Sequence, residues 1–236
     1  MNQSWSVIIF CYNEEDTIGN VIEKSNEFLT KNKISESEII VVDDGSTDGS
    51  EKIIRSCLLK FNKINYIRLP KNMGIGKALS TGYENSRNEN VVAIPGDGQF
   101  DINELKPFIN FPEKSYISFY RGGFTRYSNY RKIISRTNKF FNKLFLYLDA
   151  KDVNWVKAYK TGSLKQMNLK LESSLIGSEI CAKLNLMNYS IIESPSVYHI
   201  RAGGKSRGAS IKTLSQAGKD LIKLASTVRN FKKKLK

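Results

Sequence analysis

The chain has 236 residues, 40% of them hydrophobic, and a formal net charge of +14. This length supports one substantial hydrophobic core, and the composition excludes an intrinsically disordered protein. The excess of lysine and arginine predicts an anionic partner, which is a membrane surface, a nucleic acid or a phosphorylated substrate.

Strands and helices alternate along the first half of the chain. Short, β-branched apolar runs predict buried strands, and apolar residues at helical spacing predict helices between them. Regular alternation with short connections favours an α/β fold with a doubly wound, mostly parallel sheet. The predicted strands are 5–11, 38–43, 65–69 and 91–94, and the predicted helices are 15–30, 48–60 and Gly74 to about Ser86.

The alternation becomes weaker after about residue 115. A fifth strand is expected at 115–120, one or two helices at 128–148, and a late strand at 190–200. A terminal amphipathic helix is expected at 209–231, and no linker that would separate independent domains is visible.

Neither a membrane span nor a signal peptide is expected. No apolar run reaches the roughly 18 residues that a spanning helix needs, and the start MNQSWSVIIFCYNEE lacks a positively charged segment. Cys11, Cys57 and Cys181 form no CxxC pair, which indicates buried free thiols in a reducing compartment. We therefore expect a cytoplasmic protein.

Three acidic motifs follow three of the predicted strands. They are Tyr-Asn-Glu at 12–14, Asp-Asp-Gly-Ser at 43–46 and Gly-Asp-Gly-Gln at 96–99. Ligands of open α/β sheets bind outside the carboxyl ends of the strands, so the motifs predict one shared site. Each motif taken alone is also explained by turn and helix-cap chemistry.

Two of these motifs contain candidate ligand-binding side chains. Asp43 and Asp44 offer carboxylates that accept hydrogen bonds from a nucleobase or ribose. Asp97 and Gln99 combine a carboxylate with an amide oxygen, a set that suits Mg²⁺ or Mn²⁺ when substrate phosphates complete the coordination.

Six segments together resemble one known family. VIIFCYNEEDTIGNVI, EIIVVDDGSTDGS, IRLPKNMGIGKALSTGYENS and VVAIPGDGQFD resemble successive blocks of family 2 glycosyltransferases. RKIISRTNKFFN and VYHIRAGGKSRGAS are similar to later segments of the dolichyl- or polyprenyl-phosphate sugar synthases in that family. The blocks occur in the family's order over roughly residues 5–210.

The resemblance implies a GT-A fold with a Rossmann-like sheet that binds a nucleoside-diphosphate sugar. It implies one domain over 1–210, with a nucleotide-sugar half at 1–110, an acceptor half at 111–210 and a basic amphipathic tail at 211–236. Position by position, it implies nucleoside contacts for Tyr12, Glu14, Asp43 and Asp44, a metal and diphosphate site at Asp97 and Gln99, and close backbone approach to the nucleotide at Gly74, Gly76 and Ala78.

The chain departs from the family pattern at two positions. The usual Asp-x-Asp is Pro95-Gly96-Asp97, so the first metal carboxylate is missing, and Phe10 replaces a proline before the first motif. Phe10 simply extends a buried strand. Pro95 weakens the metal site, because one carboxylate and Gln99 leave more of the coordination to diphosphate and water.

The resemblance also implies inversion by direct displacement at the anomeric carbon. Arg201 and the metal at Asp97 are the candidates for stabilising the negative charge that develops on the leaving nucleoside diphosphate. A phosphate acceptor needs no general base, whereas a sugar hydroxyl does; Glu179 is the candidate base, with a surface position as the alternative. The candidate phosphate- and acceptor-binding residues are Arg121, Arg131, Arg136, Arg201, Ser206 and Arg207.

Two segments favour contact with an anionic membrane. The run 140–148, FFNKLFLYL, lies in the membrane interface or forms a buried core helix. In the tail, apolar residues gather near one helical face and lysines lie elsewhere, which suits either a membrane surface or a packed terminal helix. The apolar residues of that face are Leu221, Leu224, Ala225, Val228 and Phe231.

The predicted function is transfer of a sugar from a nucleoside-diphosphate sugar to a polyprenyl phosphate or another lipid-linked acceptor, by a cytoplasmic enzyme bound peripherally to the inner face of the cell membrane. The alternatives are extension of a surface polysaccharide through a sugar hydroxyl and a degenerate, non-catalytic nucleotide-binding domain. No nucleic-acid-binding signature occurs, and carboxylates at the strand ends would repel a phosphate backbone. The only histidine, His199, is assigned a structural role. The donor base and the oligomeric state stay open.

Overall fold

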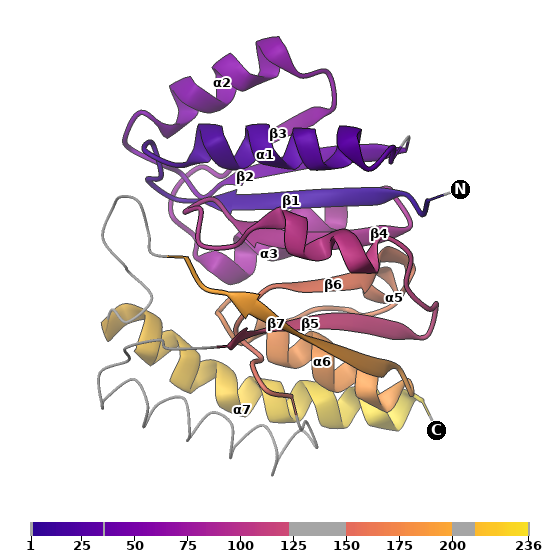
Figure 1. Ribbon diagram of the computed structural model, residues 1–236. Coiled ribbons are helices and arrows are strands. Elements are labelled where there is room, and N and C mark those ends of the chain that lie inside the picture. Colours follow the sequence, from indigo (N-terminus) through magenta and orange to yellow (C-terminus); the bar gives the residue numbers. More distant parts are fainter. Residues whose placement is uncertain (1, 35, 123–149, 200–210, 236) are drawn as a thin grey trace.

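The computed structural model describes residues 2–34, 36–122, 150–199 and 211–235. These residues form a seven-stranded sheet with helices on both of its faces (Figure 1). The predicted α/β class with a mostly parallel sheet is therefore confirmed.

The elements of the first half follow the predicted order closely. They are β1 (Trp5–Cys11), α1 (Ile18–Lys31), β2 (Ser37–Asp43), α2 (Ser50–Lys60), β3 (Ile64–Arg68), α3 (Ile75–Asn85), β4 (Asn90–Pro95) and the 3₁₀ helix η1 (Ile102–Phe108). Each predicted strand is confirmed, and helices α1 and α2 begin two or three residues later than predicted.

The second half contains elements that the sequence patterns did not predict. Its elements are β5 (Ser115–Gly122), β6 (Lys157–Lys160), α5 (Thr161–Lys165), α6 (Ile176–Leu186), β7 (Ser190–Val197) and α7 (Ile211–Lys234). Strands β5 and β7 and helix α7 were predicted, whereas β6 and α5 were missed. The helices predicted at 128–148, including the run 140–148, lie outside the described residues.

The strand order is β3-β2-β1-β4-β6-β5-β7, which joins both halves of the chain in one sheet. Strand β6 runs antiparallel to its neighbours β4 and β5, while the other described pairings are parallel. Strands β1, β2 and β4 therefore end at the same edge of the sheet, which we call the carboxyl edge.

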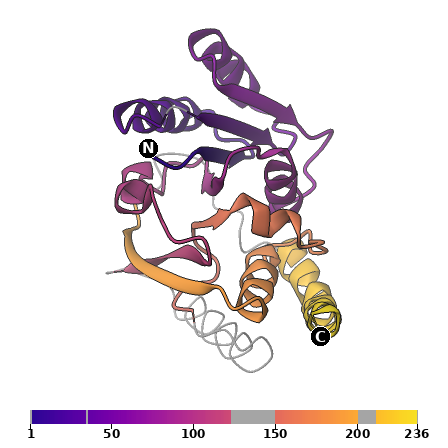
Figure 2. The ribbon, with the colours of Figure 1, turned by 90° about the vertical axis from the view of Figure 1, so that its right-hand side faces the viewer.

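Alternating side chains of the strands enter two separate cores. In β1, Val7 and Ile9 face one core with α1, α2 and η1, while Ile8 faces the other with α3 and α6. The period of two along a strand produces this division. Figure 2 shows the helices lying on both sides of the sheet.

Helix α7 packs against α6 through the apolar face predicted from the sequence. Leu224 and Val228 are buried in the core, and Leu221 and Phe231 pack beside them. The packed-helix alternative is therefore confirmed, and the idea that this face enters a membrane is wrong, because the protein's own core covers it.

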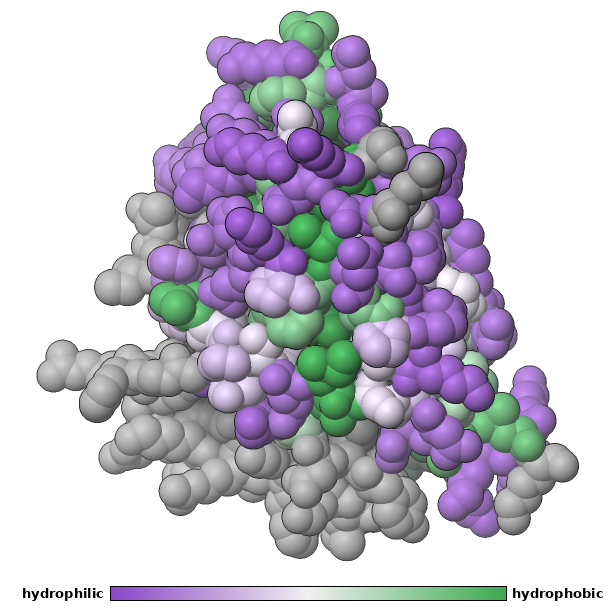
Figure 3. Space-filling model, turned by 45° about the vertical axis from the view of Figure 1, so that its right-hand side comes forward, coloured by the Kyte–Doolittle hydropathy of each residue, from purple (hydrophilic) through white to green (hydrophobic). Residues whose placement is uncertain are grey.

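Hydrophilic side chains cover most of the described surface in Figure 3, with a strip of apolar side chains down the middle and smaller apolar patches elsewhere. Within the described part of the chain, no helix has the length and apolarity to cross a bilayer.

Candidate active site

The three acidic motifs meet at the carboxyl edge, as the sequence predicts. The backbone N–H of Asp44 donates to Cys11 O at 2.9 Å, and that of Gly96 donates to Phe10 O at 2.9 Å. The Thr17 hydroxyl donates to Gly96 O at 2.8 Å. The loops after β1, β2 and β4 are thus fastened to one another.

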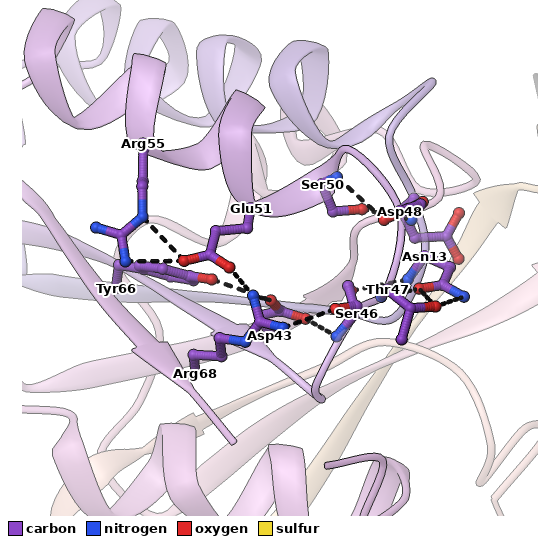
Figure 4. Close-up of polar contacts among 11 residues, drawn as sticks. Asn13, Asp43, Ser46, Thr47, Asp48, Ser50, Glu51, Arg55, Tyr66 and Arg68 are labelled. Carbon is purple, nitrogen blue, oxygen red and sulfur yellow. Dashed lines mark hydrogen bonds and ion pairs between the residues drawn. The ribbon is translucent and has the colours of Figure 1, made fainter. Parts of the chain in front are cut away.

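The loop after β1 is held by the loop after β2. Asn13 has a φ of 56°, a left-handed conformation that Asn tolerates better than most residues. Its backbone N–H donates to Ser46 Oγ at 2.9 Å, and its side-chain oxygen accepts from Thr47 N at 2.7 Å. The backbone N–H of Glu14 donates to Ser50 Oγ at 2.9 Å, and the side chain of Tyr12 is half-buried. These contacts tie the motif to the start of α2 and the loop before it, where Figure 4 shows Asn13 beside Thr47.

Asp43 lies at the centre of a buried polar network between β2, β3 and α2 (Figure 4). Its carboxylate accepts from Ser46 N at 2.8 Å and from the Tyr66 hydroxyl at 3.0 Å, and Arg68 Nη1 lies 3.9 Å away. Desolvation, followed by the charge of Asp43, raises the pKa of Tyr66 above its usual range. The neutral phenol therefore stays a donor to Asp43.

Arg68 extends this network to α2. Arg68 pairs with Glu51, and the Arg68 Nη2 group donates to Ser46 O at 2.8 Å. Glu51 also accepts from Arg55 Nε at 2.9 Å. Arg68 thereby brings a positive charge near the buried Asp43 carboxylate and holds the loop after β2 through Ser46 O.

Asp44 fixes the segment between β3 and α3. Its two oxygens accept from Met73 N at 2.7 Å and from Gly74 N at 2.9 Å. Desolvation raises the pKa of Asp44, and these two hydrogen bonds oppose the rise. Asp43 thus shapes its own loop, and Asp44 shapes the loop before α3. Their contacts with a nucleoside stay a prediction.

Two glycines are required by close contact with the chain itself. A Cβ at Gly45, whose φ is 72°, would lie 2.6 Å from the backbone of Lys71. A Cβ at Gly76 would lie 2.1 Å from the carbonyl carbon of Glu172. The 172–173 peptide occupies the space that a Cβ at Gly76 would need, so the chain itself requires glycine there. The close approach of Gly76 to a nucleotide stays a prediction. Gly74 has a φ of 97°, which also favours glycine.

Asp97 and Gln99 lie together in the loop after β4. The backbone N–H of Gln99 donates to Asp97 Oδ1 at 3.1 Å. Gln99 and His199 exchange two further hydrogen bonds, from Gln99 Nε2 to His199 O at 3.3 Å and from His199 N to Gln99 O at 3.2 Å. The chain after β7 is thereby tied to the candidate metal site.

The described residues contain no cluster of three or more histidine, cysteine or acidic side chains suited to a metal ion. Asp97 supplies a carboxylate and Gln99 an amide oxygen, and both are hard ligands. This set fits Mg²⁺ or Mn²⁺ as the partner of a diphosphate, because the phosphate oxygens would supply the missing ligands.

Arg121 is the last residue but one of β5, and its side chain is held in place. Its guanidinium binds Asp152 with two hydrogen bonds, of 2.7 and 3.2 Å, and lies 5.1 Å from the Trp155 ring and 5.8 Å from the Tyr198 ring. The buried ammonium of Lys157 donates to the carbonyls of the same loop. Desolvation lowers the pKa of Lys157.

Glu179 lies inside the protein in α6, with no exposed surface. It accepts from the backbone N–H groups of Lys170 and Leu171 at 3.0 Å and pairs with Lys183 Nζ at 2.6 Å. The surface alternative for Glu179 is wrong, since four hydrogen bonds hold its carboxylate in the interior.

The remaining predicted phosphate- and acceptor-binding residues cannot be placed relative to this edge, because Arg131, Arg136, Arg201, Ser206 and Arg207 lie outside the described residues. The sequence reasoning missed Tyr66, Arg68, Asp152, Lys157 and Lys183. A lysine within an otherwise apolar segment was the available signal for the last two.

Comparison with known proteins identifies the family. The family model for glycosyl transferase family 2 matches residues 6–174. A dolichyl-phosphate beta-glucosyltransferase of Trichomonas vaginalis is 33% identical over 104 residues, which cover 42% of this chain and 31% of that protein. An undecaprenyl-phosphate 4-deoxy-4-formamido-L-arabinose transferase of Proteus mirabilis is 30% identical over 112 residues, covering 47% and 34%.

Solved structures support the fold. Glucosyl-3-phosphoglycerate synthase from Mycobacterium tuberculosis, in complex with uridine diphosphate, aligns with a TM-score of 0.65 at 17% identity, covering 96% of this chain and 80% of that one. A complex of that synthase with Mn²⁺, uridine diphosphate and glucosyl-3-phosphoglycerate aligns with a TM-score of 0.63 at 16% identity, covering 97% and 80%. The predicted GT-A fold is confirmed.

The two relatives above are matched over about a third of their length. The family model, in contrast, covers most of the sheet and all three acidic motifs. The chain belongs to glycosyl transferase family 2.

Proposed function

We propose that the chain transfers a sugar from a nucleoside-diphosphate sugar to a polyprenyl phosphate, with inversion at the anomeric carbon. The observation that carries the proposal is the meeting of the three strand-end motifs at one edge of a family 2 fold. The names of the relatives, which act on dolichyl and undecaprenyl phosphates, support the acceptor class.

In this proposal the nucleoside lies over the loops after β1 and β2, near Tyr12, Glu14 and Asp43. The network around Asp43 and Arg68 keeps these loops in place before substrate binds, so little ordering is required on binding. Asp44 does the same for Gly74 by accepting its N–H.

Asp97 and Gln99 would hold a Mg²⁺ or Mn²⁺ ion against the diphosphate. When bound, the ion would stabilise the negative charge that develops on the leaving nucleoside diphosphate. The Mycobacterium tuberculosis synthase, which shares this fold, was solved in complex with Mn²⁺ and uridine diphosphate, and this supports a divalent cation in the proposed reaction. Arg201 follows in sequence the segment that is tied to Gln99, and we assign it to stabilising the same negative charge.

The acceptor phosphate approaches from the side of β5 and β7. It is already ionised, so this chemistry requires no general base. We assign Arg121, with Arg131, Arg136, Ser206 and Arg207, to holding the phosphate by charge-assisted hydrogen bonds. Asp152 and Trp155 orient Arg121, which limits its loss of side-chain entropy when it binds.

The acceptor is tested by partition of labelled sugar. Purified protein, a panel of labelled nucleotide sugars, Mn²⁺ and polyprenyl phosphate should yield organic-soluble label with one donor. Label that appears only in the aqueous phase, on an added oligosaccharide, would replace the lipid phosphate with a sugar hydroxyl acceptor. Absence of turnover with every donor and acceptor would support the non-catalytic alternative.

We also propose that the protein binds the inner face of an anionic membrane, where a polyprenyl phosphate is held. The inward face of α7 is used in packing, so the contact must come from its outer face and end. That surface carries Ile222, which is 80% exposed, Leu235, and the exposed lysines 232–234. Basic residues near an anionic surface contribute about 1 kcal/mol each.

Replacing Lys232, Lys233 and Lys234 by glutamate should weaken binding to phosphatidylserine vesicles by at least about a hundredfold, because three attractive charges are lost and three repulsive ones are added. Co-sedimentation measures the effect. Glutamate at the exposed Lys24, Lys33 and Lys52 gives the same net charge at the other end of the molecule and serves as the control. Equal sedimentation of the two variants would refute a specific role for α7.

A further inference from the structure

The loop of residues 168–173 lies against the beginning of α3. The carbonyl carbon of Glu172 and the backbone nitrogen of Ser173 would lie 2.1 and 2.5 Å from a Cβ at Gly76. The carbonyl oxygen of Glu172 is also 3.7 Å from the Cβ position of Gly74. Gly74 is the residue whose N–H binds Asp44. The loop therefore borders the carboxyl edge.

A buried ion pair in α6 holds this loop from beneath. Glu179 accepts from the backbone N–H groups of Lys170 and Leu171, and Lys183 Nζ donates to Asn168 O at 2.8 Å. Glu179 Oε1 and Lys183 Nζ are 2.6 Å apart, and the two side chains are 0% and 2% exposed. Between them, these side chains satisfy two N–H groups and one carbonyl of the loop.

Packing alone does not explain this pair. A buried ion pair costs desolvation that its Coulomb energy repays only partly, and apolar residues of similar volume often stabilise a core equally well. Apolar residues cannot hold three backbone groups of an irregular loop at fixed positions, because they form no hydrogen bonds. The pair is therefore suited to setting the geometry of the loop.

The same hydrogen bonds argue against Glu179 as a general base. A base must reach the proton that it removes, either directly or through one water molecule. The Glu179 carboxylate instead points to the loop backbone and to Lys183, inside the protein. The ring of Phe231 in α7 lies beside Lys183, with the ring centroid 5.3 Å from Lys183 Nζ.

We propose that Glu179 is a positioning residue which, with Lys183, fixes the 168–173 loop against α3 as a wall of the nucleotide-sugar site. The inference rests on the proposed function for the identity of the ligand, a nucleoside-diphosphate sugar. The wall places two exposed side chains, those of Lys170 and Glu172, at the border of the site.

The first test compares Glu179→Gln and Lys183→Met by calorimetry with the preferred nucleoside diphosphate and Mn²⁺. Each variant should bind about tenfold more weakly, because small displacements of positioned groups have large effects. The double variant should lose no more than either single variant. Kinetics should show a raised KM for the nucleotide sugar and an unchanged shape of the pH–rate profile.

The matched control is Glu27→Gln in α1. Glu27 and Lys31 form a pair of the same residue types at the same helical spacing, 2.8 Å apart, but 58% and 74% exposed. Its replacement should leave nucleotide affinity unchanged. A general base at position 179 would give a different result. In Glu179→Gln, kcat would fall by about 10² to 10⁴ and the pH–rate profile would lose the limb that reports the base, while nucleotide affinity stayed the same.

Hydrogen exchange of the unmodified protein tests the loop even if a variant fails to fold. Bound nucleoside diphosphate should slow exchange of the amides in 168–173 more than of those at the far end of α1. If nucleotide bound without slowing exchange in 168–173, or if both variants folded and kept full affinity, the positioning role would be overturned. The proposed function would still stand in either case. A protein that binds none of the nucleotides would overturn the proposed function, and the wall with it.

Discussion

Replacement of Asp97 by alanine should lower turnover by about 10² to 10³, the cost of removing one group that stabilises charge in the transition state. Asp97 supplies the only carboxylate of the Asp-x-Asp position, since Pro95 occupies the first place. The loss should therefore be larger here than in a site where a second carboxylate still binds the metal ion. Steady-state kinetics with saturating nucleotide sugar and Mn²⁺ measure it.

A second readout separates metal binding from damage to the fold. Mn²⁺ should increase the affinity of the unmodified protein for nucleoside diphosphate, and this increase should disappear in Asp97→Ala. Glu84→Ala, which removes an exposed carboxylate near the far end of α3, should change neither quantity. Undiminished turnover of Asp97→Ala would remove Asp97 from the mechanism.

Gly76→Ala should destabilise the protein by about 1 to 3 kcal/mol, the usual cost of overpacking. Alanine in a helix ordinarily stabilises relative to glycine by up to about 1 kcal/mol. At Gly76 the added Cβ would lie 2.1 Å from the backbone of Glu172, which is peptide rather than a flexible side chain. The steric cost should therefore exceed the gain in helix propensity.

Urea unfolding of the variants measures this effect, with Gly162→Ala as the control. Gly162 lies in α5, and a Cβ there would meet no atom within 4 Å. Its replacement should be neutral or slightly stabilising. If both variants unfolded at the same urea concentration, the close approach of the 168–173 loop to α3 would be wrong.

The first half of the fold is predictable from sequence because its information is local. Ile and Val fill β1, β2 and β4, and each strand is followed by residues that favour turns and caps. Strand β6 lacks that signal. It has four residues and begins and ends with lysine. The buried ammonium of Lys160 binds Glu89 and Gln3, which are distant in sequence.

The candidate site shows the same limit. The positions of Asp97 and Asp43 at one edge followed from the ends of their strands. The partners of Asp43, in contrast, come from β3 and α2, and no pattern in the motif indicates Tyr66 or Arg68. Glu179 was recognised as a functional candidate, but its partners Lys170, Leu171 and Lys183 depend on how a loop folds back onto its helix.

The reversed direction of β6 gives the chain an additional place for variation. At the carboxyl edge, each parallel strand is followed by its loop. Strand β6 runs the other way, and its first residue, Lys157, pairs with Ala93 near the end of β4. The loop at this edge is therefore the one that precedes β6. That loop carries Asp152 and Trp155, which orient Arg121. Grafting a different loop before β6 would therefore redesign the acceptor side while leaving every nucleotide-side loop of the four parallel strands β1–β4 in its native sequence.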